Sequence, residues 1–167
     1  TYRIEMICTD DASTIDTANV VVNVSKYVGI GGIVGSGATP PECRVCHASK
    51  ATDWEGTMHS KAILVIDVNT HFSADCLPCH TTGSPNVDAE GDGWAHRARV
   101  LGWQFPTVIQ AGNWDAIKAN FPELAKMGSV QCESCHGPGS THNGVKTDNK
   151  TAISYSASQC RQCHDAP

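Results

Sequence analysis

Apolar and polar residues alternate at the start of the chain and then lose any regular period. Apolar side chains from Tyr2 to Cys8 alternate with polar neighbours, and the alternation resumes from Ala18 to Val24 after an Asp-rich turn. A period of two over short runs is typical of β-strands, so residues 1–25 are expected to form a β-hairpin. The alternation places Cys8 on the inner face, where we expect a small buried residue.

Beyond the hairpin, the composition separates a Gly- and Pro-rich stretch from the rest of the chain. Residues 29–41 include five Gly and end in Pro-Pro, which is typical of a linker. We therefore expect three units, which are the hairpin (1–28), the linker (29–41) and the rest of the chain (42–167).

Only short helices are expected within the third unit. Ser49 or Thr52 is expected to cap a helix that extends to His59. Asn113 is expected to cap another helix, which Pro122 divides into two pieces because a proline inside a helix breaks its hydrogen-bond ladder. The remaining pattern shows no period, so most of this unit is expected to be irregular.

Large apolar residues are scarce. Leu, Ile, Val and Phe total 31 of 167 residues, and only 20 of the 125 residues from Cys43 onward. A content below about 20% is typical of chains that do not fold alone, but four Trp and 17% charged residues do not fit a disordered chain. We therefore expect something other than side chains to supply part of the core.

Charge and hydropathy indicate that the chain neither binds polyanions nor spans a membrane. The chain carries 12 basic and 17 acidic residues with no basic cluster, so neither nucleic acid nor an anionic membrane surface is expected to bind. No apolar stretch of the sequence is long enough for a membrane span.

Eight of the nine cysteines lie in four copies of Cys-x-x-Cys-His, whereas random placement gives about 0.02 copies. This motif is the attachment site of c-type haem, because its two thiols form thioethers with one porphyrin and its His ligates the iron. Zinc also binds Cys-x-x-Cys pairs, but it needs no His after every second Cys, and the gaps of 29, 52 and 24 residues exceed the usual spacing. The sequence thus predicts four haem c groups. The expected attachment residues are Cys43, Cys46, Cys76, Cys79, Cys132, Cys135, Cys160 and Cys163, and the expected proximal iron ligands are His47, His80, His136 and His164.

Four histidines remain, one for each expected haem. A single spare His is usually a surface or core residue, but four spares for four irons favour bis-histidine ligation. Six-coordinate iron offers no open position to a substrate, so we expect electron transfer and no catalytic residue. The expected distal ligands are His59, His71, His96 and His142.

The spacing leaves the pairing of distal histidines with haems open. His71 precedes Cys76 by five residues and His142 follows His136 by six, so each is expected to serve a haem other than that of its adjacent motif. Met58 is the Met nearest an expected ligand, and we expect it to pack rather than to ligate.

Two stretches resemble the cytochrome c554-like multihaem family. They are Trp54-Glu-Gly-Thr-Met-His59-Ser-Lys-Ala and Cys132-Glu-Ser-Cys135-His136-Gly-Pro-Gly-Ser-Thr-His142. The resemblance extends over roughly residues 42 to 167. It implies stacked haem pairs, short helices and few strands, and it places His59 and His142 as distal ligands.

Haem number, length and ligation also resemble the tetrahaem subunits of extracellular cytochrome nanowires. In such filaments a histidine of one subunit can ligate a haem of its neighbour, and His96, in the longest span between motifs, is the candidate here. Residues 1–25 resemble the last two strands of an immunoglobulin-like domain. Because an isolated hairpin is marginal in water, its edge is expected to need a partner strand.

The expected fold is mostly irregular, with short helices around four c-type haems and an N-terminal β-hairpin. The expected function is electron conduction outside the cytoplasmic membrane, in an extracellular or cell-surface filament, since haem c is attached on the outer side of that membrane. Its partners would be identical subunits, other redox proteins and extracellular electron acceptors. Three alternatives remain open: a soluble periplasmic electron carrier, a small multihaem reductase or oxidase with one open haem, and a cytochrome module of a longer surface protein.

Overall fold

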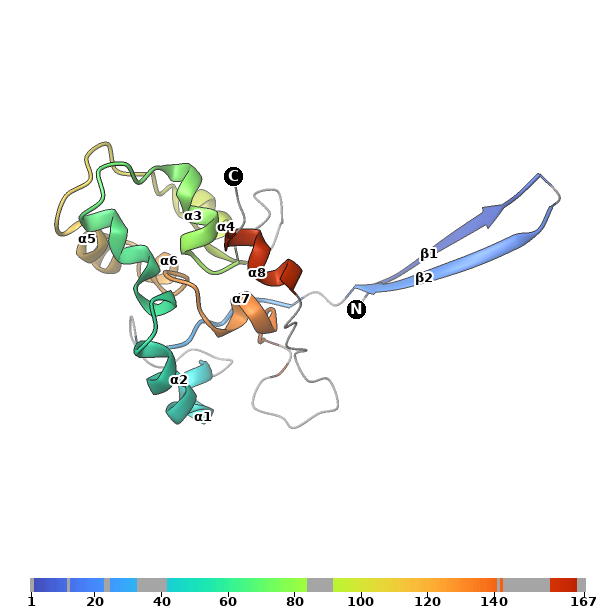
Figure 1. Cartoon of the computed structure of the whole chain (residues 1–167), viewed down its shortest axis with the longest axis horizontal. Coiled ribbons are helices and arrows are strands. Elements are labelled where there is room, and N and C mark those ends of the chain that lie inside the picture. Colours follow the sequence, from blue (N-terminus) through green and yellow to red (C-terminus); the bar gives the residue numbers. More distant parts are fainter. Residues whose placement is uncertain are drawn as a thin grey trace.

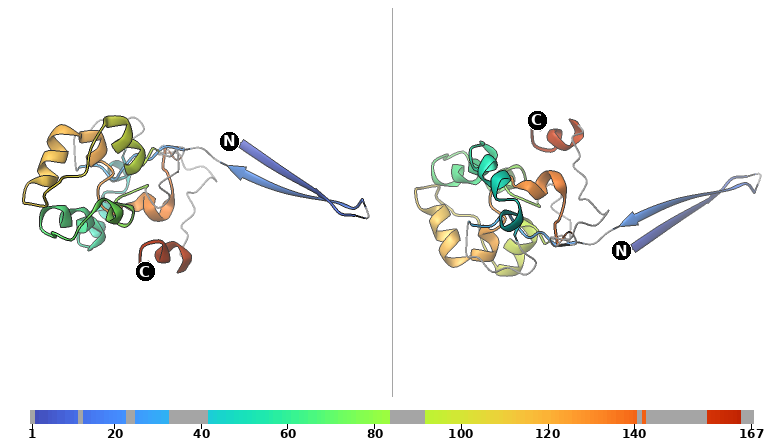
Figure 2. Two further views of the ribbon diagram at one scale, coloured as in Figure 1. Left: turned by 90° about the horizontal axis from the view of Figure 1, so that it is seen from above. Right: turned by 90° about the horizontal axis from the view of Figure 1, so that it is seen from below.

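A two-stranded hairpin projects from a body of short helices (Figure 1). The views from above and from below in Figure 2 show the same separation of hairpin and body. The computed structural model describes residues 2–11, 13–22, 25–32, 42–83, 92–140, 142 and 157–164. The elements are β1 (Tyr2–Thr9), β2 (Ile15–Val22), α1 (Cys43–Cys46), α2 (Ala48–Glu55), η1 (His59–Asp67), η2 (Ala74–Cys76), α3 (Leu77–His80), α4 (Trp94–Leu101), α5 (Asn113–Asn120), α6 (Pro122–Ala125), α7 (Cys132–His136) and α8 (Ala157–His164), where η denotes a 3₁₀ helix.

Strands β1 and β2 pair antiparallel, with Met6 opposite Ala18. The turn between them is closed by Asp10, whose carboxylate accepts a hydrogen bond from the amide of Thr14 at 2.8 Å. Cys8 is exposed, and the expectation of a buried residue is wrong. The reason is that both faces of the hairpin lie away from the helical body (Figure 2).

The helix starts differ from those expected. Helix α2 begins at Ala48 with His47 before it, and not at Ser49 or Thr52, because the turn of the first Cys-x-x-Cys-His motif runs on into this helix. Gly112, rather than Asn113, precedes the first residue of α5. As expected, the chain breaks at Pro122, which is the first residue of α6.

Side chains form a compact apolar core in the middle of the body. Trp94, Ile63 and Leu124 retain at most 1% of their exposed area. Within the described residues, the buried members of this core all come from the chain between Ile63 and Met127. Of the four motifs, each of which lies within the described residues, only the second contributes to it, through Leu77. Among the helices described, none is both long and apolar enough to cross a membrane.

Candidate functional site

Each Cys-x-x-Cys-His motif lies in a helical turn. The two cysteines of a motif are three residues apart, and residues at this spacing are neighbours on one face of a helix. A single turn therefore presents two thiols, and the adjacent His completes the set. The four turns are α1 with His47 directly after it, α3 with Cys76 directly before it, α7, and the second half of α8.

Two pairs of imidazole rings, one stacked and one tilted, lie close together. The ring centres of His47 and His142 are 6.2 Å apart, and those of His59 and His164 are 6.0 Å apart. An imidazole nitrogen ligates a metal ion at about 2 Å and lies about 1.2 Å from its ring centre, so two rings on one iron have centres about 6.3 Å apart. Both observed separations fit an iron between the rings.

The largest cavity described adjoins the second of these pairs. Its volume is about 610 Å³, within the range of about 300–1,000 Å³ that is usual for cofactor sites. Its walls include His59, His164 and both cysteines of the fourth motif, Cys160 and Cys163. Cys79, His80 and Cys135 line the same cavity, so it holds four thiols and three imidazoles, among them the two thiols and two imidazoles that one bis-histidine haem c requires.

The motifs approach one another in an order that differs from the sequence. The thiols of Cys43 and Cys132 are hydrogen-bonded, which raises the pKa of Cys43 and lowers that of Cys132 to about 7. A second thiol pair joins Cys79 and Cys163, and burial followed by this contact raises the pKa of Cys163 to about 11. Cys135 shares the large cavity with the fourth motif. Cys79 and His80 of the second motif line this cavity too, so the second, third and fourth motifs lie together and the first adjoins the third.

Residues 28–30 connect the first and third motifs. The amides of Cys43 and Arg44 donate to the carbonyls of Gly29 and Ile30 at 3.2 and 2.9 Å. On the other side, the amide of Ile30 donates to the side-chain oxygen of Gln131 at 2.7 Å. This part of the expected linker is thus fixed between α1 and α7.

Thr82 connects the second and third motifs in a similar way. Its side chain is fully buried, and its hydroxyl donates to the carbonyl of Ser129 at 2.7 Å. The same hydroxyl accepts from the amide of Gln131 at 3.0 Å, and the amide of Thr82 donates to the carbonyl of Met127 at 2.8 Å. These bonds hold the exit of α3 against the entry to α7.

His80 is oriented by its surroundings. Its Nδ1 lies 2.6 Å from the carbonyl oxygen of Ala62, so Nδ1 carries the proton and Nε2 is left for a metal ion. The edge of Phe72 packs against the ring, with centres 5.0 Å apart. This hydrogen bond is typical of a histidine that ligates a metal.

Two of the expected distal ligands, His71 and His96, do not lie close to an expected proximal ligand among the described residues. Among the residues described, neither His71 nor His96 makes a ring contact with His80 or His136 like those of the two pairs above. His71 is exposed, and Nδ1 of His96 faces the Arg99 guanidinium at 3.4 Å. Met58, expected to pack beside His59, retains 78% of its exposed area, and that expectation is wrong because α2 ends before it.

A buried carboxylate lies in the wall of the large cavity. Glu133 accepts hydrogen bonds from the amides of Val28, Gly29 and Gly139. Burial raises the pKa of Glu133, and these backbone donors oppose the rise. Burial, together with the nearby Glu133, also raises the pKa of Tyr27 in the same wall. We did not expect a role for Glu133 from the sequence, although an acidic residue inside a haem-attachment motif is a visible signal.

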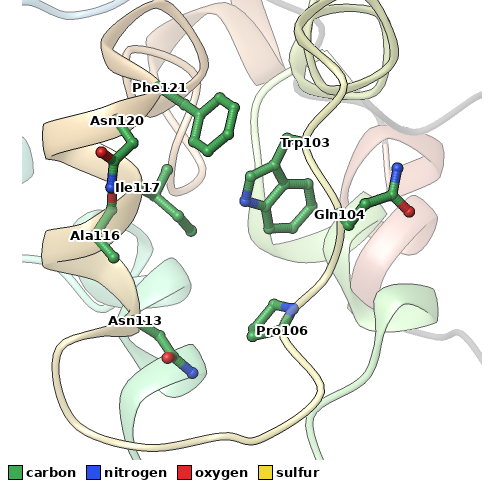
Figure 3. A pocket seen from close by; sticks show the side chains of 8 residues that line it. All are labelled: Trp103, Gln104, Pro106, Asn113, Ala116, Ile117, Asn120 and Phe121. Atoms are coloured by element: carbon green, nitrogen blue, oxygen red, sulfur yellow. The ribbon is translucent and has the colours of Figure 1, made fainter.

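A second cavity of about 120 Å³ lies between α5 and the segment after α4 (Figure 3). Trp103 and Ile117 face each other across it, with Phe121 at one end. It contains no Cys or His, so it is separate from the motifs. The lining residues are Trp103, Gln104, Pro106, Asn113, Ala116, Ile117, Asn120 and Phe121.

Comparison with protein families gives one match. The family described as "Cytochrome c554 and c-prime" matches residues 42–99. This match supports a c-type cytochrome. It therefore also supports haem c binding and a role in electron transfer, and it spans the first two motifs together with His59, His71 and His96. The last two motifs and His142 lie outside the matched residues. No curated protein and no solved structure matches the chain.

Proposed function

We propose that this c-type cytochrome binds four haems, each between two histidines, and conducts electrons as the repeating subunit of an extracellular filament. The observation that carries the haem part of the proposal is the pair of ring separations, 6.2 and 6.0 Å, at His47–His142 and His59–His164. Both pairs join an expected proximal ligand to an expected distal one, across 95 and 105 residues of sequence.

The residues of the chain have distinct tasks in this proposal. Bound haem supplies an iron that exchanges one electron between its ferric and ferrous states. The thiols of each motif would attach the group, and the paired imidazoles would hold its iron and exclude substrate. The carbonyl of Ala62 fixes the ring of His80 so that Nε2 is the ligand.

The spatial order of the motifs supports a continuous electron path. The first and third motifs meet at the thiols of Cys43 and Cys132, and the second and fourth meet at those of Cys79 and Cys163. The second, third and fourth motifs share the walls of the large cavity. Attachment sites in contact place their cofactors next to each other, so an electron entering at the first motif would have a path to the other three.

The hairpin supports assembly into a polymer. Ile4, Met6, Ile7 and Ile15 are 57–65% exposed on two strands that have no third strand beside them in the described residues. Exposed apolar side chains on unpaired strands are a template for pairing with another chain. A neighbouring subunit would cover them, and attachment of haem c on the outer side of the cytoplasmic membrane agrees with an extracellular location.

Two measurements on the purified, haem-loaded chain test the proposal. Electron micrographs are expected to contain filaments, and spectra are expected to contain only low-spin haem that does not bind carbon monoxide. A chain that stays monomeric at every concentration would contradict the filament and favour a soluble carrier. Carbon monoxide binding by the unmodified protein would contradict ligation by two histidines at every iron and favour a reductase or oxidase.

A further inference from the structure

Glu133, inside the third Cys-x-x-Cys-His motif, joins three backbone amides from two distant segments. The residue retains 3% of its exposed area. One carboxylate oxygen accepts from Gly139 at 2.7 Å and the other from Gly29 at 2.7 Å, while the amide of Val28 lies 3.0 and 3.1 Å from the two oxygens. Hydrogen bonds to a carboxylate are about twice as strong as bonds between neutral groups, so this is a firm contact.

Gly139 begins the turn that carries His142. Gly137, with φ of +76°, redirects the chain after α7, and the amide of His142 donates to the carbonyl of Gly139 at 3.0 Å. The residue that Glu133 holds is therefore the first residue of the turn that ends in the imidazole. The ring of that imidazole lies 6.2 Å from the ring of His47.

The opposite side of this loop is held by Ser25 and Lys26. The hydroxyl of Ser25 donates to the carbonyl of Pro138 at 3.0 Å, and the amide of Lys26 donates to the hydroxyl of Ser140 at 2.7 Å. Val28 and Gly29, which Glu133 binds, follow in the same segment after Tyr27. The carboxylate thus joins the loop to the segment against which the loop rests.

The geometry points to Glu133 as a positioning residue for His142. Its carboxylate, on the attachment turn of the third haem, holds the loop whose imidazole ligates the iron of the first haem. This inference rests on the proposed function, since it requires a haem between His47 and His142. Without the carboxylate, buried amides lose their acceptor, and the loop must move or admit water to satisfy them.

The test compares Glu133→Ala and Glu133→Gln with Gln131→Ala in the full, haem-loaded chain. Gln131 is a matched control, because it is 2% exposed and holds Ile30 in the same segment, while its hydrogen bonds go to residues outside the loop 137–142. The readouts are haem content per chain, the high-spin fraction by electron paramagnetic resonance, and carbon monoxide bound per chain.

Glu133→Ala is expected to keep four haems and to convert up to one of them to a high-spin form that binds carbon monoxide. Added imidazole is expected to restore the low-spin spectrum, because it replaces the displaced ligand. Glu133→Gln keeps one acceptor oxygen, so a smaller high-spin fraction is expected, and this variant carries the test if Glu133→Ala does not assemble. Gln131→Ala is expected to stay low-spin.

A double variant identifies which haem is affected. His142→Ala alone is expected to leave one haem high-spin, and adding Glu133→Ala is expected to change nothing further. A low-spin spectrum for both Glu133 variants, an equal effect of Gln131→Ala, or a second high-spin haem in the double variant would overturn the inference. Fewer than four haems, or a high-spin haem, in the unmodified protein would instead contradict the proposed function itself.

Discussion

Replacing His59 by Ala is expected to change the number of carbon monoxide molecules bound per chain by a whole number. The rings of His59 and His164 have centres 6.0 Å apart, which matches the separation of about 6.3 Å for two imidazoles on one iron. An Ala side chain at position 59 ends several ångströms short of that iron. One haem of the four is therefore expected to become five-coordinate, while both its thioethers remain.

The assay is carbon monoxide titration of the reduced protein. The unmodified chain is expected to bind none, His59→Ala one molecule per chain, and the double variant His59→Ala, His142→Ala two. Haem content is expected to stay at four in each case. The space that the missing imidazole of His59 leaves is larger than carbon monoxide, so the ligand can reach the opened side of the iron.

Met58→Ala is the matched control for this prediction. Met58 adjoins His59 and is 78% exposed. It is the methionine nearest to His59 along the chain, so it is the alternative side chain that could bind iron there. Its removal is expected to leave every haem low-spin and inert to carbon monoxide. The reasoning from ring separation would be refuted if His59→Ala retained four low-spin haems, or if Met58→Ala, rather than His59→Ala, opened a site.

Three further outcomes are expected. Gly29→Ala should lower the free energy of unfolding by more than about 1 kcal/mol, and by more than Gly102→Ala, in denaturant titrations. Both glycines have positive φ, but only at Gly29 would a Cβ meet a backbone oxygen, that of Lys126 at 2.9 Å. Equal losses for the two variants would contradict this. Glu42→Gln should stabilise the fold at pH 8 and should stabilise it less in acid, where the carboxyl is protonated in both states. Burial raises the pKa of Glu42, whose Oε1 has no partner among the described residues. The unmodified protein therefore has its full stability below the ordinary carboxyl pKa and loses stability as the pH rises through the raised pKa. A stabilisation by Glu42→Gln that is the same in acid and at pH 8 would contradict this. Replacing Met6 on the hairpin by Asp should shorten or abolish filaments in micrographs while the haem spectrum stays unchanged, and normal filaments would contradict a role of the hairpin in assembly.

The sequence was most informative where chemistry requires short local patterns. Cys-x-x-Cys-His needs one helical turn, and the structure has a turn at each of the four motifs. The division of the helix at Pro122 follows from the missing amide of proline and is equally local. The hairpin likewise follows from alternation within a stretch of about twenty residues.

Contacts between distant segments were beyond such reasoning. His47 meets His142, and Glu133 binds Val28, across stretches that no periodicity describes. The exposure of Cys8 is a related case, because alternation identifies two faces of a hairpin without saying whether either is covered. The aliphatic content was low on average, but it did not reveal that, within the described chain, residues 63 to 127 supply the buried apolar core by themselves.

The central claim is that eight cysteines hold four haems covalently. The most direct test is the intact mass of the purified chain under denaturing conditions, which remove haem that is only ligated but leave thioethers in place. The account predicts the mass of the polypeptide, 17.7 kDa, plus four haem groups, with Cys8 as the single free thiol. A mass that includes fewer haems, or motif cysteines that remain open to alkylation, would contradict it.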